Sequence, residues 1–251
     1  MDIAHAAFRI EAPRQLAADQ VHLWRVDLQA IAGEEPQWAA VLSPDEQARA
    51  ARFHFQEHRR YFTASRAILR HVLSAYLGCN PKNVAFVYSS KNKPALGGAH
   101  AGALAFNVSH SGDIALLAIA RSRPVGVDIE LIRHNFDTAA IAARFFSDAE
   151  QKQLAALPPD QRHDAFFRCW TRKEAYIKAL GEGLSLPLSQ FDVSLTPDDG
   201  NALIATRPDA LEARRWSLRE VRVKPGYAAA LCVQGTDWTL IDWNATPGRT
   251  P

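Results

Sequence analysis

Two ten-residue segments of the chain resemble each other, and each lies in a longer stretch whose apolar residues have helical spacing. The segments are Tyr61–Arg70 and Cys169–Lys178. The surrounding stretches, at about residues 57–77 and 159–180, predict long helices, and both are followed by a glycine that favours helix termination. The repeat predicts two similar halves, each with one long helix packed on a small sheet.

Shorter patterns place the remaining elements around these helices. Capping boxes at Ser43–Glu46 and Ser147–Glu150 predict two further helix starts. Strands are expected at 21–28, 84–88, 103–119 (a hairpin whose turn includes 109–113), 124–130, 191–195, 203–206, 216–223, 227–233 and 239–243, with 246–251 as a frayed tail. We therefore expect an α+β fold, a pseudo-dimer of two similar α/β halves with mainly antiparallel sheets. The halves would be residues 1–120 and 121–251.

Composition and charge exclude several classes of protein. The chain has 251 residues, 47% of them hydrophobic and 22% charged, which is ordinary for a globular protein. Its formal net charge of +2 is too small to indicate nucleic-acid binding. The three cysteines lack metal-site spacing, and neither a signal peptide nor a membrane-spanning run is recognisable. We expect a cytoplasmic protein that binds neither nucleic acid nor membrane.

One predicted strand combines an apolar face with an acidic face. In an extended strand alternate side chains share a face, so Val125, Val127 and Ile129 point the same way. Asp128 and Glu130 point the other way. Two carboxylates so close together repel each other unless a cation lies between them. A hard cation such as Mg²⁺, held by a few carboxylates, water and a substrate phosphate, is the usual occupant.

The second long helix supplies a third carboxylate with a lysine beside it. Glu174 and Lys178 are four residues apart and share one helix face. Taken alone, an Asp-x-Glu pair usually only ends a strand, and such a Glu–Lys pair is usually a surface ion pair worth about 0.2–0.5 kcal/mol. Together, Asp128, Glu130 and Glu174 predict a metal site beside a positive charge, which suits phosphate chemistry.

These segments resemble the paired signature of the 4′-phosphopantetheinyl transferases. The two parts of that signature are Gly126-Val127-Asp128-Ile129-Glu130 and Trp170-x-x-Lys173-Glu174-Ala175-x-x-Lys178. Other stretches match the family in order, namely Lys93-Pro94, Phe106-Asn107-Val108-Ser109-His110-Ser111, Arg144–Ser147 and Gly183–Leu188. The similarity spans roughly residues 43–233. It is with the surfactin-type, pseudo-dimeric class rather than with the small trimeric holo-acyl-carrier-protein synthases.

The resemblance implies transfer of 4′-phosphopantetheine from coenzyme A to a serine of an acyl or peptidyl carrier protein, with release of 3′,5′-ADP. The site would lie between the two halves. Asp128, Glu130 and Glu174 would bind Mg²⁺, with Mn²⁺ as a possible substitute. Glu174, or a water that it holds, is the candidate base for the serine, and Lys178 would stabilise the leaving 3′,5′-ADP. Because both halves belong to one chain, a monomer is expected.

The same resemblance implies a set of residues that bind coenzyme A. They are Arg49, Arg66, Lys93, Ser109, His110, Lys173 and Lys178. Lys93 would contact the nucleotide end. Arg49, Arg52 and Arg66 could reach the 3′-phosphate, and Arg49 is our choice among them. The chain departs from the surfactin-type pattern at Glu46, which stands where a basic phosphate contact is expected.

Other interpretations stay open on the sequence. Ser109 and His110 could be a nucleophile and its base, although the chain has no G-x-S-x-G elbow and no acid obviously placed to orient the histidine. A Mg²⁺-dependent hydrolase or nuclease could use the same three acids, and a non-catalytic carrier-binding protein could keep the same fold. Phe145 and Phe146 lie where the family docks its carrier, so an exposed phenylalanine there would be informative.

Overall fold

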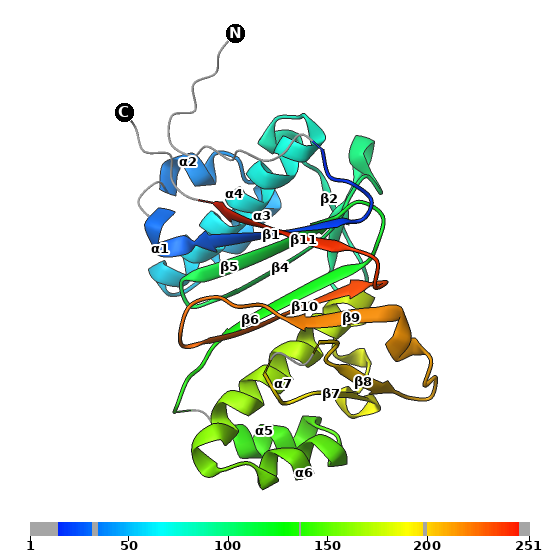
Figure 1. Ribbon diagram of the computed structural model, residues 1–251. Helices are drawn as coiled ribbons and strands as arrows, with labels where there is room; N and C mark the ends of the chain where they lie inside the picture. The colour runs from blue at the N-terminus through cyan, green and yellow to red at the C-terminus, as the bar shows by residue number, and fades with distance from the viewer. Residues whose placement is uncertain (1–14, 32–34, 136, 198–199, 246–251) are drawn as a thin grey trace.

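The computed structural model describes residues 15–31, 35–135, 137–197 and 200–245. Within this part of the chain, two sheets cross the middle of the molecule, with strand orders β11-β1-β5-β4 and β6-β10-β9 (Figure 1). The long helix α4 (Gln56–Leu77) packs on the first sheet and α7 (Pro159–Leu180) on the second. The mixed α+β fold with two similar halves is therefore confirmed.

The first half contains the strands and helices near the N-terminus. Its strands are β1 (Gln20–Asp27), β2 (Phe86–Tyr88), β3 (Pro94–Leu96), β4 (Ala105–Ser111) and β5 (Ile114–Ala120). Besides α4, its helices are α1 (Leu28–Ile31), α2 (Glu35–Ala39) and α3 (Pro44–Ala51). Helix α4 ends at Gly78, whose φ of +64° is a conformation that favours glycine. Its buried face, including Ile68 and Leu69, packs against Leu117 of β5.

The second half repeats this arrangement with different connections. Its strands are β6 (Val125–Leu131), β7 (Phe191–Val193), β8 (Leu203–Thr206), β9 (Trp216–Glu220) and β10 (Tyr227–Gln234). Besides α7, its helices are α5 (Thr138–Phe145) and α6 (Asp148–Ala156). Helix α7 ends at Gly181, with a φ of +80°. Phe166 and Tyr176 of α7 pack against Leu218 and Cys232 of the second sheet.

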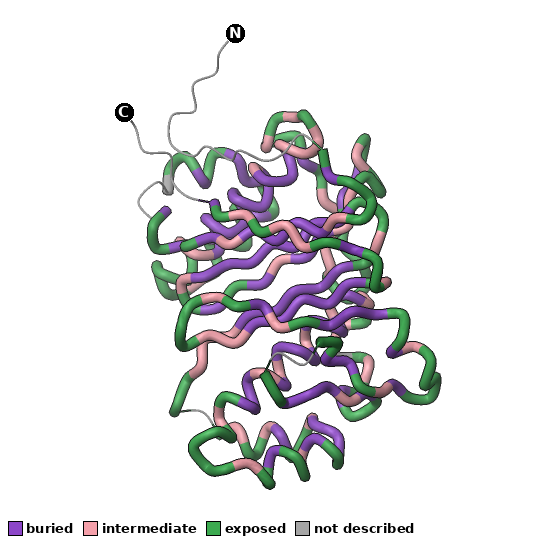
Figure 2. The backbone as a smooth tube through the Cα atoms, viewed as in Figure 1, coloured by how far each residue is buried: buried purple, intermediate pink, exposed green. Residues whose placement is uncertain are grey.

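A third apolar core lies between the two sheets. It takes alternate residues of β5, such as Leu116, and alternate residues of β6, including Val127 and Ile129. Figure 2 shows these central strands as the most continuously buried part of the chain. The opposite face of β6, with Gly126 and Asp128, lies against α7. The two-faced character predicted for this strand is therefore observed.

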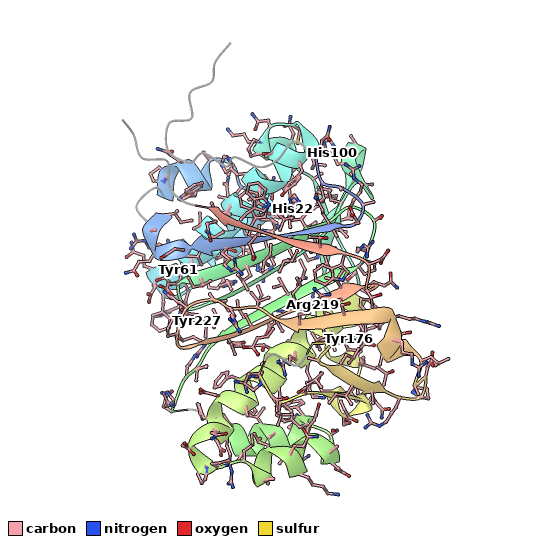
Figure 3. The ribbon with its side chains drawn as sticks, in the orientation of Figure 1. His22, Tyr61, His100, Tyr176, Arg219 and Tyr227 are labelled. Carbon is pink, nitrogen blue, oxygen red and sulfur yellow. The ribbon has the colours of Figure 1, made fainter. Side chains whose placement is uncertain are left out.

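A polar contact joins the two halves at one end of the sheets. The hydroxyl group of Tyr227 on β10 donates to the carboxylate of Asp113, in the turn between β4 and β5. Figure 3 shows the position of Tyr227. Lys224 lies on the other side of the same carboxylate, with 2.6 Å between its Nζ and Oδ2. This cluster ties the second sheet to the hairpin of the first.

Three features differ from expectation. Strand β11 (Thr239–Ala245), expected in the C-terminal half, pairs in parallel with β1 and so belongs to the N-terminal sheet. Residues 109–111, expected in a hairpin turn, continue β4, and the turn is confined to the next two residues. Helices α1, α2 and α5 and strand β3 are not anticipated by the sequence patterns. The tail expected at 246–251 lies outside the described residues.

No helix in the part of the chain that the structure describes is long and apolar enough to cross a membrane.

Contact between Gly126 and α7 gives a first prediction. A β-carbon at this position would lie 2.2 Å from the carbonyl oxygen of Ala175 and 2.3 Å from the nitrogen of Ala179. Both atoms are backbone, so Gly126→Ala forces the helix away from the strand. We expect a loss of about 1–3 kcal/mol or more in the free energy of unfolding, measured with urea.

Gly97→Ala is the matched control for this experiment. Its β-carbon would overlap Cγ1 of Val87, at 2.8 Å, but that residue is 53% exposed and its side chain is able to move. The nearest backbone atoms, of Phe86 and Val87, lie at an ordinary contact distance of 3.6 Å. A loss in Gly126→Ala no larger than in Gly97→Ala would contradict the importance of the close contact.

Candidate active site

An ion pair joins strand β6 to helix α7. The side chain of Asp128 is buried, and Nζ of Lys178 lies 2.5 Å from its Oδ1. Lys178 also donates to Oγ of Ser109 at 3.0 Å, while Ser109 donates to Oδ1 of Asp128 at 2.9 Å. Glu174 lies one turn before Lys178 on the same helix face. Three of the predicted site residues, Asp128, Lys178 and Ser109, are therefore in direct contact.

Alternate side chains of β4 cross from the first half to β6. Oδ1 of Asn107 accepts a hydrogen bond from the backbone nitrogen of Val127 at 2.9 Å. Oγ of Ser111 donates to Oε2 of Glu130 at 2.9 Å and accepts from the nitrogen of Leu131 at 3.0 Å. These contacts, together with that of Ser109, orient two of the carboxylates from the opposite half.

Burial and mutual repulsion dominate the charge state of the acids. Burial, reinforced by the negative charges of Asp128 and Glu130, raises the pKa of Glu174 to about 7, and Lys178 offsets only part of this. Burial and Asp128 also raise the pKa of Glu130, although the hydrogen bond from Ser111 and the charges of Lys178 and Arg133 oppose them. The positive charge in the site is therefore too small to keep the pKa values of Glu130 and Glu174 at their ordinary level.

The donor set fits a hard divalent cation. Oδ2 of Asp128 is buried and has no hydrogen-bond partner among the residues that the structure describes. Carboxylate oxygens are the ligands that Mg²⁺ prefers, and bound charge would favour the ionised forms of Glu130 and Glu174. No group of three His, Cys, Asp or Glu side chains among the described residues already has a metal-binding arrangement. In this geometry Lys178 supplies the cation beside Asp128.

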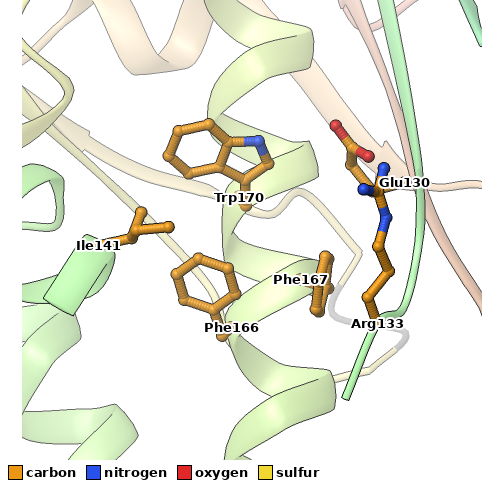
Figure 4. A pocket seen from close by; sticks show the side chains of 6 residues that line it. All are labelled: Glu130, Arg133, Ile141, Phe166, Phe167 and Trp170. Carbon is orange, nitrogen blue, oxygen red and sulfur yellow. The ribbon is translucent and has the colours of Figure 1, made fainter. Parts of the chain in front are cut away.

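Cavities with shared lining residues follow the boundary between the halves. An apolar cavity of about 180 Å³ is lined by Glu130, Arg133, Ile141, Phe166, Phe167 and Trp170 (Figure 4). A cavity of about 520 Å³ shares Glu130 and Arg133 with it and also reaches His110 and Phe53. Phe53 and Arg49 then line a cavity of about 610 Å³. Together, these three cavities could accommodate a long ligand that extends on both sides of Glu130.

His110 lines the central cavity and does not form a pair with Ser109. Successive strand residues point to opposite faces, and Ser109 is occupied by Asp128 and Lys178. The nucleophile hypothesis therefore does not fit the geometry. Partial burial and the positive charges of Lys178 and Arg49 lower the pKa of His110. Arg49, His110 and Lys178 form a series of basic groups that leads to the carboxylates.

Glu46 is the buried partner of two arginines. Its Oε1 accepts from Nε of Arg66 at 2.9 Å, and its Oε2 accepts from Nε of Arg70 at 2.7 Å. Although burial raises the pKa of Glu46, Arg70 and Arg66 together lower it overall. Arg66 also donates to the hydroxyl of Tyr88 at 3.0 Å. With Arg49, it lines a cavity of about 350 Å³.

The expected role of Lys173 in binding coenzyme A is wrong. The residue is fully buried, and its Nζ lies 2.8 Å from Oε1 of Glu150. It also donates to the carbonyl oxygens of Leu188 and Phe191, each at 2.7 Å. An ammonium group has three N–H donors, and these contacts occupy all of them. Lys173 is a structural residue of the second half.

Lys93 also has a different setting from the one expected. Its Nζ donates to the carbonyl oxygens of Lys178, at 2.5 Å, and Ala179, at 3.1 Å. A nucleotide contact through the ammonium group would have to use the one remaining N–H.

Phe145 is half-buried and Phe146 is buried, so neither is the exposed phenylalanine that would mark a docking surface.

The sequence patterns missed the site roles of Asn107, Ser111 and Gly126. The signal that could have found the first two is alternation, because residues 107, 109 and 111 share one face of any strand through 105–111. The expectation of a turn at 109–113 concealed this alternation. For Gly126, a glycine between the β-branched residues Val125 and Val127 of a strand indicates close approach of another backbone.

Buried carboxylates next to a lysine and a basic cavity suit an enzyme that transfers phosphate-containing groups. Comparisons with known proteins define the family. Residues 124–232 match the 4′-phosphopantetheinyl transferase superfamily, and residues 32–122 match the 4′-phosphopantetheinyl transferase N-terminal domain. The chain belongs to the 4′-phosphopantetheinyl transferase family and is an enzyme of that class.

Individual relatives agree with this assignment. The chain is 43% identical over 231 residues to the 4′-phosphopantetheinyl transferase HetI of a Nostoc species, covering 91% of this chain and 94% of that protein. It is 32% identical over 208 residues to Sfp of Bacillus subtilis, covering 82% and 88%. A Thermotoga maritima holo-[acyl-carrier-protein] synthase matches 45% of this chain and 63% of its own at 19% identity, with a TM-score of 0.35, too low to support an argument.

The raised pKa of Glu174 predicts a pH-dependent effect on stability. Without metal, the folded protein favours protonated Glu174, whose ordinary pKa is 4.5 and whose folded pKa is about 7. The stability gained from this protonation is complete below the ordinary value and is lost as the pH rises through about 7. Glu174→Gln mimics the protonated form. In EDTA at pH 8 we expect the free energy of unfolding of Glu174→Gln to exceed that of the wild type by on the order of 1–3 kcal/mol.

Urea unfolding at pH 8 and pH 4 measures the effect, and the difference should shrink at the lower pH. Glu182→Gln, at an exposed glutamate just beyond α7, is the matched control and should show no such gain. Equal stability of wild type and Glu174→Gln at both values would show that Glu174 is not destabilised by its surroundings.

Proposed function

We propose that this enzyme transfers the 4′-phosphopantetheine group of coenzyme A to a serine of an acyl or peptidyl carrier protein, with Mg²⁺ and release of 3′,5′-ADP. The observation that carries the proposal is the meeting of Asp128, Glu174 and Lys178 beside Glu130, which lines two of the cavities at the boundary between the halves. Transferase names among the relatives support the same activity.

The reaction needs one proton acceptor and stabilisation of one leaving group. The serine hydroxyl loses its proton, its oxygen forms a bond to the β-phosphorus of coenzyme A, and the bond from that phosphorus to the bridging oxygen breaks. The electron pair leaves on 3′,5′-ADP. Glu174, with its raised pKa, is suited to accept the proton directly or through a water. Lys178, at the end of the same helix face, is suited to hold the leaving phosphate.

Asp128, Glu130 and Glu174 are the residues that would hold the metal. Bound Mg²⁺ would neutralise negative charge on the pyrophosphate oxygens, and Mn²⁺ should substitute because it shares the oxygen preference. The unpartnered Oδ2 of Asp128 and the raised pKa values of the two glutamates support this assignment. Ser109 and Ser111 would keep Asp128 and Glu130 oriented when the cation is bound.

Arg49 and Arg66 are our candidates for the nucleotide end of coenzyme A. Both line one cavity, and Arg49 is the exposed member. Arg66 shares its charge with Glu46, so Arg49 should contribute more to 3′-phosphate binding. His110, which feels the charges of both Arg49 and Lys178, is suited to a phosphate between these two ends. The carrier would approach from the apolar cavity beside Glu130, where Trp170 packs against Phe145.

Intact-mass analysis of an apo carrier protein tests the reaction. After incubation with the enzyme, coenzyme A and Mg²⁺, we expect a mass gain of one phosphopantetheine. EDTA and Glu174→Gln should each abolish the gain, because they remove the metal or the proton acceptor. Glu182→Gln should retain it.

Other outcomes of the same assay identify the alternatives. Consumption of coenzyme A without a mass gain on fatty-acid, polyketide or peptide carriers would favour a hydrolase. Binding of the carrier with no reaction would favour a non-catalytic relative. Either result would contradict the proposed transfer.

Binding measurements test the basic groups. By calorimetry, Arg49→Met should weaken coenzyme A binding by about tenfold or more, because a charge-assisted contact is lost. With 3′-dephospho-coenzyme A the same substitution should have little effect. His110→Ala should weaken binding of both ligands. Arg214→Met, at an exposed arginine of the second half, is the charge-matched control. Unchanged affinity in Arg49→Met and His110→Ala would contradict these contacts.

A further inference from the structure

The C-terminal turn of α7 leaves backbone carbonyl groups without helical partners. The last four carbonyls of any helix lack an intrahelical donor. The nitrogen of Gly181 reaches the carbonyl oxygen of Ile177 at 2.9 Å and satisfies one of them. The next two, those of Lys178 and Ala179, accept from Nζ of Lys93. A single side chain from the other half therefore satisfies two of the four carbonyls at the end of this helix.

A closed turn presents Lys93 to the helix. Oγ of Ser89 accepts from the backbone nitrogens of Lys91 and Lys93 at 3.2 and 3.1 Å, and the nitrogen of Ser89 donates to the carbonyl of Lys93 at 3.0 Å. Asn92 has a φ of +61°, a conformation that asparagine tolerates. The backbone at Lys93 is thus held between β2 and β3 before its side chain crosses to α7.

The residues just beyond α7 pack directly on this turn. A β-carbon at Gly181 would lie 3.4 Å from Cδ of Lys93, and one at Gly183 would lie 3.7 Å from Cβ of Lys91. The ammonium group of Lys93 is half-buried there, at the negative end of the helix dipole. Its charge and its donors therefore both stabilise the last turn.

That last turn carries Lys178. Gly126 holds the turn against β6 from one side, and Lys93 holds its carbonyl groups from the other. Release of the carbonyls would let the turn fray, and Nζ of Lys178 would move from Asp128 and Ser109. We propose that Lys93 is a positioning residue that caps α7 from the N-terminal half and keeps Lys178 in place for the transfer reaction. This inference rests on the proposed function for its effect on rate, but not for its effect on the helix.

Steady-state kinetics of Lys93→Met test the positioning role. Because a small displacement of a reacting group can cost one or two orders of magnitude, we expect kcat to fall by about tenfold or more. The KM for coenzyme A should change by less than about twofold, because in the proposed role the ammonium group of Lys93 holds the helix and not the substrate. The fall in kcat should be the same with 3′-dephospho-coenzyme A. Lys93→Arg, which keeps charge and donors, should recover much of the rate.

Lys91→Met is the matched control, because it removes the same charge from an exposed lysine in the same turn. A fall in kcat as large as that of Lys93→Met would overturn the proposal in favour of a general charge effect. An increase in KM that disappears with 3′-dephospho-coenzyme A would overturn it in favour of direct phosphate binding.

Hydrogen exchange of the substrate-free protein tests the cap separately from catalysis. In Lys93→Met, amides of residues 178–182 should exchange faster than in wild type, while the first turns of α7 keep their protection. Unchanged exchange in this segment would overturn the proposal. If the wild-type enzyme transfers nothing to any carrier, the proposed function fails, yet the exchange result still decides whether Lys93 caps the helix.

Discussion

The absence of a side chain at Gly126 is the constraint on which the site geometry depends. The backbone of α7 lies so close to β6 that a β-carbon would overlap the carbonyl of Ala175 and the nitrogen of Ala179. At this separation the side chain of Lys178 spans the gap to Asp128. A helix displaced by the width of a methyl group would leave a buried carboxylate without its cation, which is costly. One glycine thus determines how carboxylates from two elements meet.

In each half, the glutamate of a capping box anchors the long helix, but the two long helices present different charges to the boundary. Each capping-box glutamate also forms a buried ion pair with its long helix: Glu46 with Arg66 and Arg70, and Glu150 with Lys173. In the aligned segments, Arg66 stands where the second half has Glu174. The first half therefore presents cations to the boundary and the second presents carboxylates. A ligand with phosphates at both ends of its polar part would match that asymmetry if one end met the cations directly and the other met the carboxylates through the proposed Mg²⁺.

Local signals predicted the elements well because they act through the nearest turns of the chain. The ends of α7 follow from Pro159 and Gly181, and the faces of β6 follow from alternation. The pairing of β11 with β1 joins the two ends of the described chain. The residue pattern of a short strand does not indicate which distant strand it pairs with. Lys173 was misassigned although its helical spacing from Phe166 and Tyr176 puts it on the apolar face. Glu174, the next residue, lies on a different face of the helix because adjacent helix residues are about 100° apart.

The boundary between β4 and β6 explains why site residues and structural residues coincide. A continuous backbone ladder would bring the strands to about 4.8 Å and merge the two sheets. Instead, side chains of Asn107 and Ser111 satisfy two backbone nitrogens on β6, so the edge of β6 is not left as an unpaired template. Ser111, and Ser109 beside it, also hold the carboxylates of Glu130 and Asp128. The same side chains therefore protect the edge of β6 and orient the acids. Replacing these small polar residues with apolar ones would remove the protection and the orientation together.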